Sequence, residues 1–187
     1  MNHWRERDEL SRVRMVPVLV IAIVTLGILF GAWQGYQQYR LIAPLQAELS
    51  KIPGVESVTI NRSPSDTVVI QLGPVQTLVN HDLQSTYNEI QNDVIGTLGS
   101  GESIILKDKS DQTLTLDYES LQPIIFEGLN HGTYTQMIAN VEKAAAKEGI
   151  QARVTMDYHN IYIQLQQGSH YLYDFHAYRL GQGGAVQ

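Results

Sequence analysis

No cysteine occurs anywhere in the 187 residues of the sequence. Disulfide bonds, thiolate metal sites and cysteine catalysis are therefore excluded, so the folded part must be held together by packing alone. The short motifs of a nucleophile elbow, a zincin helix and an EF-hand loop are absent as well. We therefore expect a protein that is not an enzyme and that carries no cofactor.

Basic residues are also few. The chain has 13 Lys and Arg against 19 Asp and Glu, which gives a formal net charge of −6 at pH 7. A surface that attracts nucleic acid needs clustered positive charge. The composition therefore predicts that nucleic acid is not a partner.

One segment, Met15 to Trp33, lacks charged residues altogether, and its only side-chain hydroxyl is Thr25. As a helix it would be about 28 Å long, close to the roughly 30 Å hydrocarbon core of a bilayer. A buried core helix is the alternative, but such helices are usually shorter and carry a polar stripe. The segment therefore predicts a single transmembrane helix in contact with lipid.

Arginines before this segment predict its orientation. Residues 1–14 contain four of them, namely Arg5, Arg7, Arg12 and Arg14. By the positive-inside rule, residues 1–14 form a short cytoplasmic tail and the bulk of the chain lies outside the cytoplasm. A removable signal peptide is the alternative, but its apolar region usually has only 7 to 15 residues. We expect an uncleaved, single-pass anchor in the cell membrane.

Hydrophobic periodicity divides the remaining chain into helices and strands. The predicted helices cover residues 35–52, 82–98 and 133–148. The predicted strands are 55–61 with 67–72, 103–107 with 113–117, 150–156 with 161–165, and a final strand 170–178. Alternation of polar and apolar residues supports the strand 113–117, and residues 121–131, which contain Pro123, are expected to be a connector.

A sequence pattern near the front recurs near the end. Residues 58–60 and 68–72 match residues 154–156 and 161–165, and each copy follows a helix closed by glycine, at Gly54 and Gly149. Chance similarity between amphipathic hairpins is the alternative. The repeat predicts an α+β fold in which repeated α-β-β units pack helices on a mostly antiparallel sheet. The expected modules are residues 34–118 and 119–180, followed by a flexible tail over 181–187.

The layout resembles that of the bitopic assembly-platform subunits of type IV pilus and type II secretion systems. A short basic tail, one span and small helix-plus-hairpin modules carry this likeness. The sequence Pro53-Gly54-Val55, followed by Val58 and Ile60, is also similar to ring-building and BON modules of envelope complexes. The resemblance implies a scaffold without catalysis, whose partners are other envelope proteins or further copies of the chain.

Histidines and one carboxylate suggest a different chemistry. On an extended strand, His170, Asp174 and His176 share one face, and His159 lies in the preceding turn. Imidazole and carboxylate together can bind zinc. A half-exposed strand would also carry polar residues on this face. We therefore expect an extracytoplasmic protein-protein interaction scaffold of a bacterial envelope assembly, with a surface-anchored metal-binding or small-ligand-binding domain as the alternative.

Overall fold

The computed structural model describes residues 15–37, 42–61, 67–101 and 103–178. The predicted tails 1–14 and 181–187 and the turn at 62–66 lie outside these residues. The chain forms two compact units, Met1–Ala43 and Pro44–Gln187. Each unit is described by itself below.

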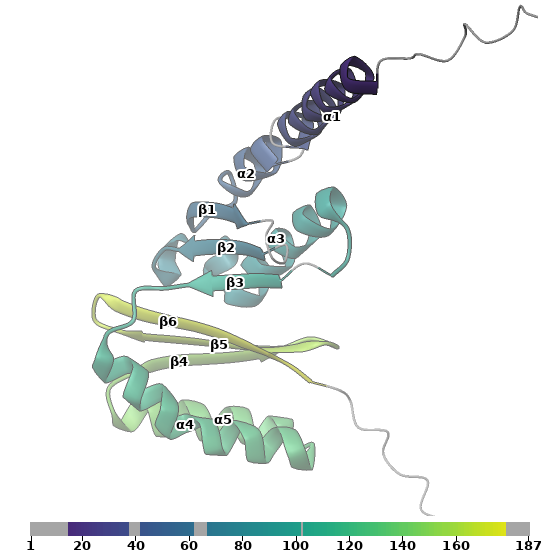
Figure 1. The fold of residues 1–187 in the computed structure, drawn as a ribbon. Helices are drawn as coiled ribbons and strands as arrows, with labels where there is room; N and C mark the ends of the chain where they lie inside the picture. Colours follow the sequence, from purple (N-terminus) through teal and green to yellow (C-terminus); the bar gives the residue numbers. More distant parts are fainter. Residues whose placement is uncertain (1–14, 38–41, 62–66, 102, 179–187) are drawn as a thin grey trace, which may run out of the picture. The chain divides into compact units, whose positions relative to one another are not determined.

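The first unit contains one long helix, α1 (Met15–Gln37), of 23 residues (Figure 1). The predicted segment is therefore helical, and the helix extends beyond Trp33. Its eleven large apolar side chains from Val18 to Trp33 are between 53% and 71% exposed. Side chains in α1 are described for residues 17–33 and 36, and within the described residues no helix is both long and apolar enough to cross a membrane.

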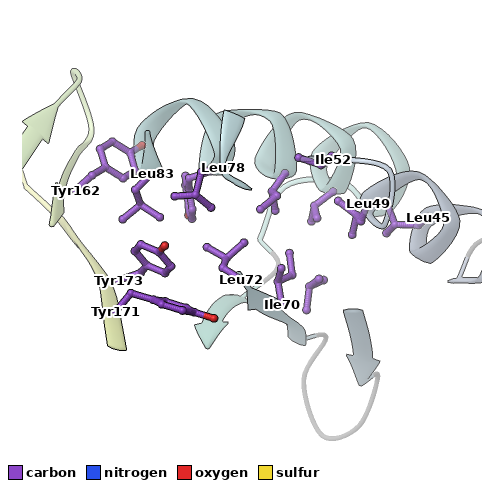
Figure 2. Packing of buried hydrophobic residues seen from close by; sticks show 14 residues of the cluster. Leu45, Leu49, Ile52, Ile70, Leu72, Leu78, Leu83, Tyr162, Tyr171 and Tyr173 are labelled. Atoms are coloured by element: carbon purple, nitrogen blue, oxygen red, sulfur yellow. The ribbon is translucent and has the colours of Figure 1, made fainter. Parts of the chain in front are cut away.

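The second unit begins with an N-terminal module, which runs from α2 to β3. Its sheet has the order β1-β2-β3, with β1 antiparallel to β2 and β2 parallel to β3. Helices α2 and α3 bury their apolar residues with the inward face of β2 (Figure 2). The regular elements are α2 (Ala43–Leu49), β1 (Val55–Asn61), β2 (Thr67–Leu72), α3 (Leu83–Leu98) and β3 (Ser103–Lys107).

A C-terminal module follows, in which two helices precede three antiparallel strands. The sheet order is β4-β5-β6, so β5 is the central strand. One face of the sheet packs on α4 and α5. The elements are α4 (Gln112–His131), α5 (Tyr134–Lys147), β4 (Gln151–Met156), β5 (Asn160–Gln167) and β6 (His170–Ala177). The α+β class is therefore confirmed, with two small sheets in place of one.

The predicted strand 113–117 and the predicted connector 121–131 are wrong, because both belong to α4. Asp111 caps this helix by accepting a hydrogen bond from the backbone N–H of Leu114 at 2.8 Å. Leu114 and Tyr118 are buried one turn apart, whereas Leu116 between them is 56% exposed. The burial of one side of the helix therefore outweighs the alternation of polar and apolar residues over 113–117. As a result, β3 pairs with β2 in parallel, and α4 runs across the expected module boundary at residue 118.

The two hairpins β1-β2 and β4-β5 pair matching residues in the same register. In each hairpin, two cross-strand pairs join the positions that the sequence comparison aligned. These pairs are Val58 with Ile70 and Ile60 with Val68, and Val154 with Ile163 and Met156 with Ile161. The modules differ beyond the hairpins, since the first adds α3 and the parallel strand β3 whereas the second adds the antiparallel strand β6.

Strand β5 is buried on both faces. Ile161 and Ile163 contribute to the core under α4 and α5. Tyr162 faces the other way and joins Tyr171 and Tyr173 of β6 in the core of the N-terminal module (Figure 2). The sheet of the C-terminal module therefore has an apolar layer on each side, which makes the two modules one packed body.

Hydrogen bonds cross between the modules at the start of α3. The side-chain oxygen of Gln164 in β5 accepts from the backbone N–H of Leu83 at 3.0 Å, and both residues are buried. Asp82 caps α3 by accepting from the N–H of Ser85 at 2.9 Å. Oδ1 of Asp82 lies 3.2 Å from Nε of Arg153 in β4. The two groups form an ion pair, but they are not aligned well enough for a hydrogen bond. The first turn of α3 is thus capped partly by the C-terminal module.

Substitution Gln164→Leu keeps the size of the side chain but leaves the N–H of Leu83 buried without its acceptor. We expect the free energy of unfolding to fall by about 1–3 kcal/mol. Urea denaturation of both proteins measures this loss. Gln151→Leu, at an exposed position on β4, is the matched control and should change stability little; equal losses in both variants would contradict the capping role.

Tyrosines at the same contact predict sensitivity to alkali. Burial raises the pKa of Tyr162 and Tyr173 above the usual value of 10.0, and the nearby carboxylates of Asp157 and Asp108, respectively, raise it further. An unfolded chain ionises these phenols near pH 10, whereas the folded chain keeps them neutral. Their contribution to stability is therefore complete below about pH 10 and is lost as the pH rises above it.

We expect the free energy of unfolding to decline steadily above about pH 10. Denaturant titrations at a series of pH values, followed by circular dichroism, measure the decline. Tyr162→Phe should make the dependence on pH shallower, because one of the phenols with a raised pKa is removed. An unchanged slope in this variant would show that other groups control alkaline unfolding.

Candidate functional site

The structure brings together two of the four residues that the sequence proposed as metal ligands. Oδ2 of Asp174 and Nε2 of His176 lie 3.4 Å apart. His170, at the other end of β6, instead pairs with Asp111 at 3.4 Å. His159 is exposed in the turn between β4 and β5. In the described part of the chain, no three His, Asp or Glu side chains are grouped so that they could hold a metal ion.

Tyr118 of α4 joins Asp174 and His176 to form a three-residue group, which we call the α4–β6 cluster. Its hydroxyl donates a hydrogen bond to Oδ2 of Asp174 and lies 3.0 Å from Nε2 of His176. A phenol has one proton, which here goes to the carboxylate, so Nε2 of His176 must be the donor to the phenol oxygen. The cluster is therefore a directed chain of hydrogen bonds from His176 through Tyr118 to Asp174.

Burial divides the cluster into an inner and an outer part. Tyr118 is 6% exposed. Burial raises its pKa far above the usual value, and the hydrogen bond to Asp174 and the charge of Asp174 add to this effect. The side chains of Asp174 and His176 are 35% and 24% exposed. A neutral phenol thus lies beneath a carboxylate and an imidazole that solvent can reach.

Neighbouring groups fix the two outer side chains. Oδ1 of Asp174 accepts a hydrogen bond from the backbone N–H of Phe175 at 2.8 Å. The ring of Phe126 meets the ring of His176 edge to face, with centroids 5.5 Å apart. Both outer side chains are therefore oriented by contacts other than their contact with Tyr118.

Sequence reasoning missed Tyr118 because it placed residues 113–117 in a strand. A signal was nevertheless present. Leu114, Tyr118, Leu121 and Ile125 recur at spacings of three and four, and all are buried on one side of α4. Reading that pattern as helical would have placed Tyr118 on a buried face, although its pairing with β6 depends on tertiary structure.

A second group of polar side chains surrounds Asp157 in the β4–β5 turn. Asp157 accepts hydrogen bonds from the N–H of His159 at 2.7 Å, the N–H of Asn160 at 2.8 Å and the hydroxyl of Tyr162 at 2.8 Å. Burial alone would raise the pKa of Asp157, but these hydrogen bonds outweigh it and the pKa lies below its usual value. These three hydrogen bonds to the carboxylate of Asp157 come from the turn and its own hairpin, so they stabilise the turn.

Two hollows lie along the groove between α4 and α5, with volumes of about 220 and 360 Å³. The larger hollow is near the connection between the helices and is lined in part by Glu127, His131 and Gln136. His131 hydrogen-bonds through Nδ1 to the carbonyl oxygen of Glu127 at 3.0 Å. This contact closes the last turn of α4, so it accounts for His131 without a ligand.

One face of the sheet β1-β2-β3 is turned away from the core of the N-terminal module. Thr59, Val69 and Ile105 pair side by side across the three strands on this face. Thr59 is exposed, and Ile105 is 45% exposed. Gln46 of α2 donates to the carbonyl oxygen of Val58 at 3.4 Å, which covers part of the β1 edge.

Comparison with known proteins finds no relative. No family model, no curated protein and no solved structure matches the chain. The function must therefore be argued from the residues and contacts described above.

Substitution Tyr118→Phe removes the donor to Asp174 and the acceptor for His176 while keeping the aromatic ring. Because solvent reaches both partners, water replaces part of what is lost, and we expect unfolding to become easier by about 1–2 kcal/mol. Urea denaturation gives the value. Tyr158→Phe, at a side chain that is 81% exposed, should leave stability unchanged; a Tyr118→Phe protein as stable as the parent would show that the cluster does not join α4 to β6.

Proposed function

We propose that this protein is a single-pass membrane protein whose outer α+β unit binds other proteins, as a non-enzymatic scaffold component of a bacterial envelope assembly. The anchor is α1. The partners are other envelope proteins or further copies of the chain. The proposal rests on the apolar surface of α1 and on the polarity of the second unit.

The apolar surface of α1 carries the proposal. From Val18 to Trp33 its large side chains are more than half exposed, and no charged residue interrupts them. Each Å² of such surface in water costs roughly 25 cal/mol, so a surface of this size requires an apolar covering. Lipid is the covering that suits it, because the residues are apolar around the whole helix rather than along one stripe.

The length and ends of α1 support the same covering. Its 23 residues correspond to about 34 Å, slightly more than a hydrocarbon core of roughly 30 Å. Trp33 and Tyr36 occur near its C-terminal end, where aromatic side chains suit a membrane interface. The arginines of residues 1–14 favour a cytoplasmic N-terminus, although those residues lie outside the described part of the chain.

Binding rather than catalysis is the role we infer for the second unit. Its acidic composition disfavours nucleic acid. Its small helix-on-sheet modules fit the layout of the assembly-platform subunits that the sequence resembles. A two-module body tethered to lipid would present protein-binding surfaces outside the membrane.

The double substitution Val24→Arg and Leu26→Arg places two charges near the middle of α1. Each charge disfavours insertion by about 2.5–3.5 kcal/mol at the centre of a span. We expect the variant to leave the membrane fraction on alkaline extraction, whereas the parent protein stays. Leu116→Arg, at an exposed apolar position in α4, is the control for an added charge outside α1 and should remain in the membrane.

Orientation and partner binding are tested on the same cells. Protease added outside should remove the second unit and spare residues 1–14. Cross-linking before detergent extraction should trap the chain in a complex larger than one copy. A parent protein that washes off the membrane would contradict the anchor, and a protein that stays anchored but is always a single copy without partners would contradict the scaffold role.

A further inference from the structure

Three donor atoms of the α4–β6 cluster converge on one point. Oη of Tyr118 and Nε2 of His176 are 3.0 Å apart, and Nε2 of His176 and Oδ2 of Asp174 are 3.4 Å apart. Tyr118 and Asp174 are joined by a hydrogen bond. Adjacent ligand atoms around a six-coordinate ion with bonds of about 2.1 Å are about 3.0 Å apart. Two of the three donor–donor distances are therefore close to the edge of a triangular face of an octahedron, and the Tyr118–Asp174 hydrogen bond is a shorter third edge.

The donor types narrow the choice of ion. A phenolate and a carboxylate are hard, anionic oxygen ligands, and an imidazole is a ligand that iron also accepts. Zinc sites in proteins use Cys, His and Asp or Glu in a mostly tetrahedral arrangement, and a phenolate is not among their usual ligands. We propose that Tyr118, Asp174 and His176 form a binding site for ferric iron. This proposal does not depend on the membrane anchor.

The ligand set differs from the one that the sequence suggested. His170 forms an ion pair with Asp111, and His159 lies in an exposed turn. Tyr118, which comes from a helix far away in the sequence, takes their place. A single strand could not have supplied three close donors, because residues four apart on it are separated by about 13 Å.

Proton balance is straightforward at this site. Without iron, the phenol proton lies between Tyr118 and Asp174, and the imidazole proton is on Nε2 of His176. On binding, the phenol proton leaves to water, and the imidazole stays neutral by carrying its proton on Nδ1. One proton is thus released per ion, and the positive charge of the ion offsets the burial and the neighbouring carboxylate that otherwise keep Tyr118 neutral.

Access and orientation also suit a bound ion. The exposed fractions of Asp174 and His176 leave room for water or hydroxide at the remaining coordination positions. The N–H of Phe175 holds the second carboxylate oxygen, and Phe126 limits rotation of the imidazole. Such supporting contacts are what keep metal ligands in place.

The test uses the full chain in detergent micelles, titrated with ferric nitrilotriacetate near neutral pH. Iron bound to a tyrosinate gives a charge-transfer band in visible light. We expect this band to rise to one equivalent of iron in the parent protein and to be lost in Tyr118→Phe. Tyr158→Phe, which changes a tyrosine in the exposed turn, should keep the full band. His176→Gln and Asp174→Asn should each weaken iron binding at least tenfold.

Two further measurements keep the test independent of folding defects. Circular dichroism establishes that each variant is folded, and resonance Raman spectra of the parent protein show tyrosinate vibrations directly if the band is real. Absence of the band in the parent protein would overturn the proposal. A band of equal strength in folded Tyr118→Phe would overturn it too, as would thermal stabilisation by iron that is the same in both proteins.

Discussion

The burial of β5 on both faces is the constraint on which the second unit depends. Consecutive residues of this strand face opposite layers, so Ile161 and Ile163 pack under α4 and α5 while Tyr162 and Gln164 face the N-terminal module. Polar groups on a doubly buried strand need partners. Gln164 finds its partner in the first turn of α3, and this contact ties the position of α3 to that of the central sheet. Neither module can move away without exposing apolar surface and breaking hydrogen bonds.

The same sheet positions the α4–β6 cluster. Strand β6 is held in register by its pairing with β5, and α4 is joined to β6 near both ends of the strand. At the first end Asp111, the cap of α4, pairs with His170. Near the other end Tyr118 meets Asp174 and His176. The donors converge because a helix and a strand that are far apart in sequence are fixed at two points.

Prediction from the sequence succeeded where the apolar residues fit only one periodicity, and it failed where they fit two. The apolar α1, the hairpins β1-β2 and β4-β5 and the amphipathic α5 each follow a single pattern, and all are present. In α4 the positions of Leu114 and Tyr118 fit a period of 2 as well as a period of 3.6, and Pro123 suggested a break that the helix accommodates. The cap at Asp111 was the local clue. The parallel pairing of β3 with β2 had no local signal, because α3 separates the two strands. Asp174 and His176 could be found from the sequence because they lie on one strand. Tyr118 could not, because it is far from them in the sequence.

The two contacts between α4 and β6 differ in the desolvation that they require. His170 and Asp111 are each about 40% exposed, so their pairing costs little desolvation and contributes little to stability. The cluster buries a phenol against a carboxylate, and such buried polar groups are often no more stabilising than apolar residues of the same size. Apolar packing was available here, since Leu114 and Leu172 lie in the same core. A polar cluster at a place where apolar residues could also have packed, with two of its side chains open to solvent, is an arrangement that suits a binding site.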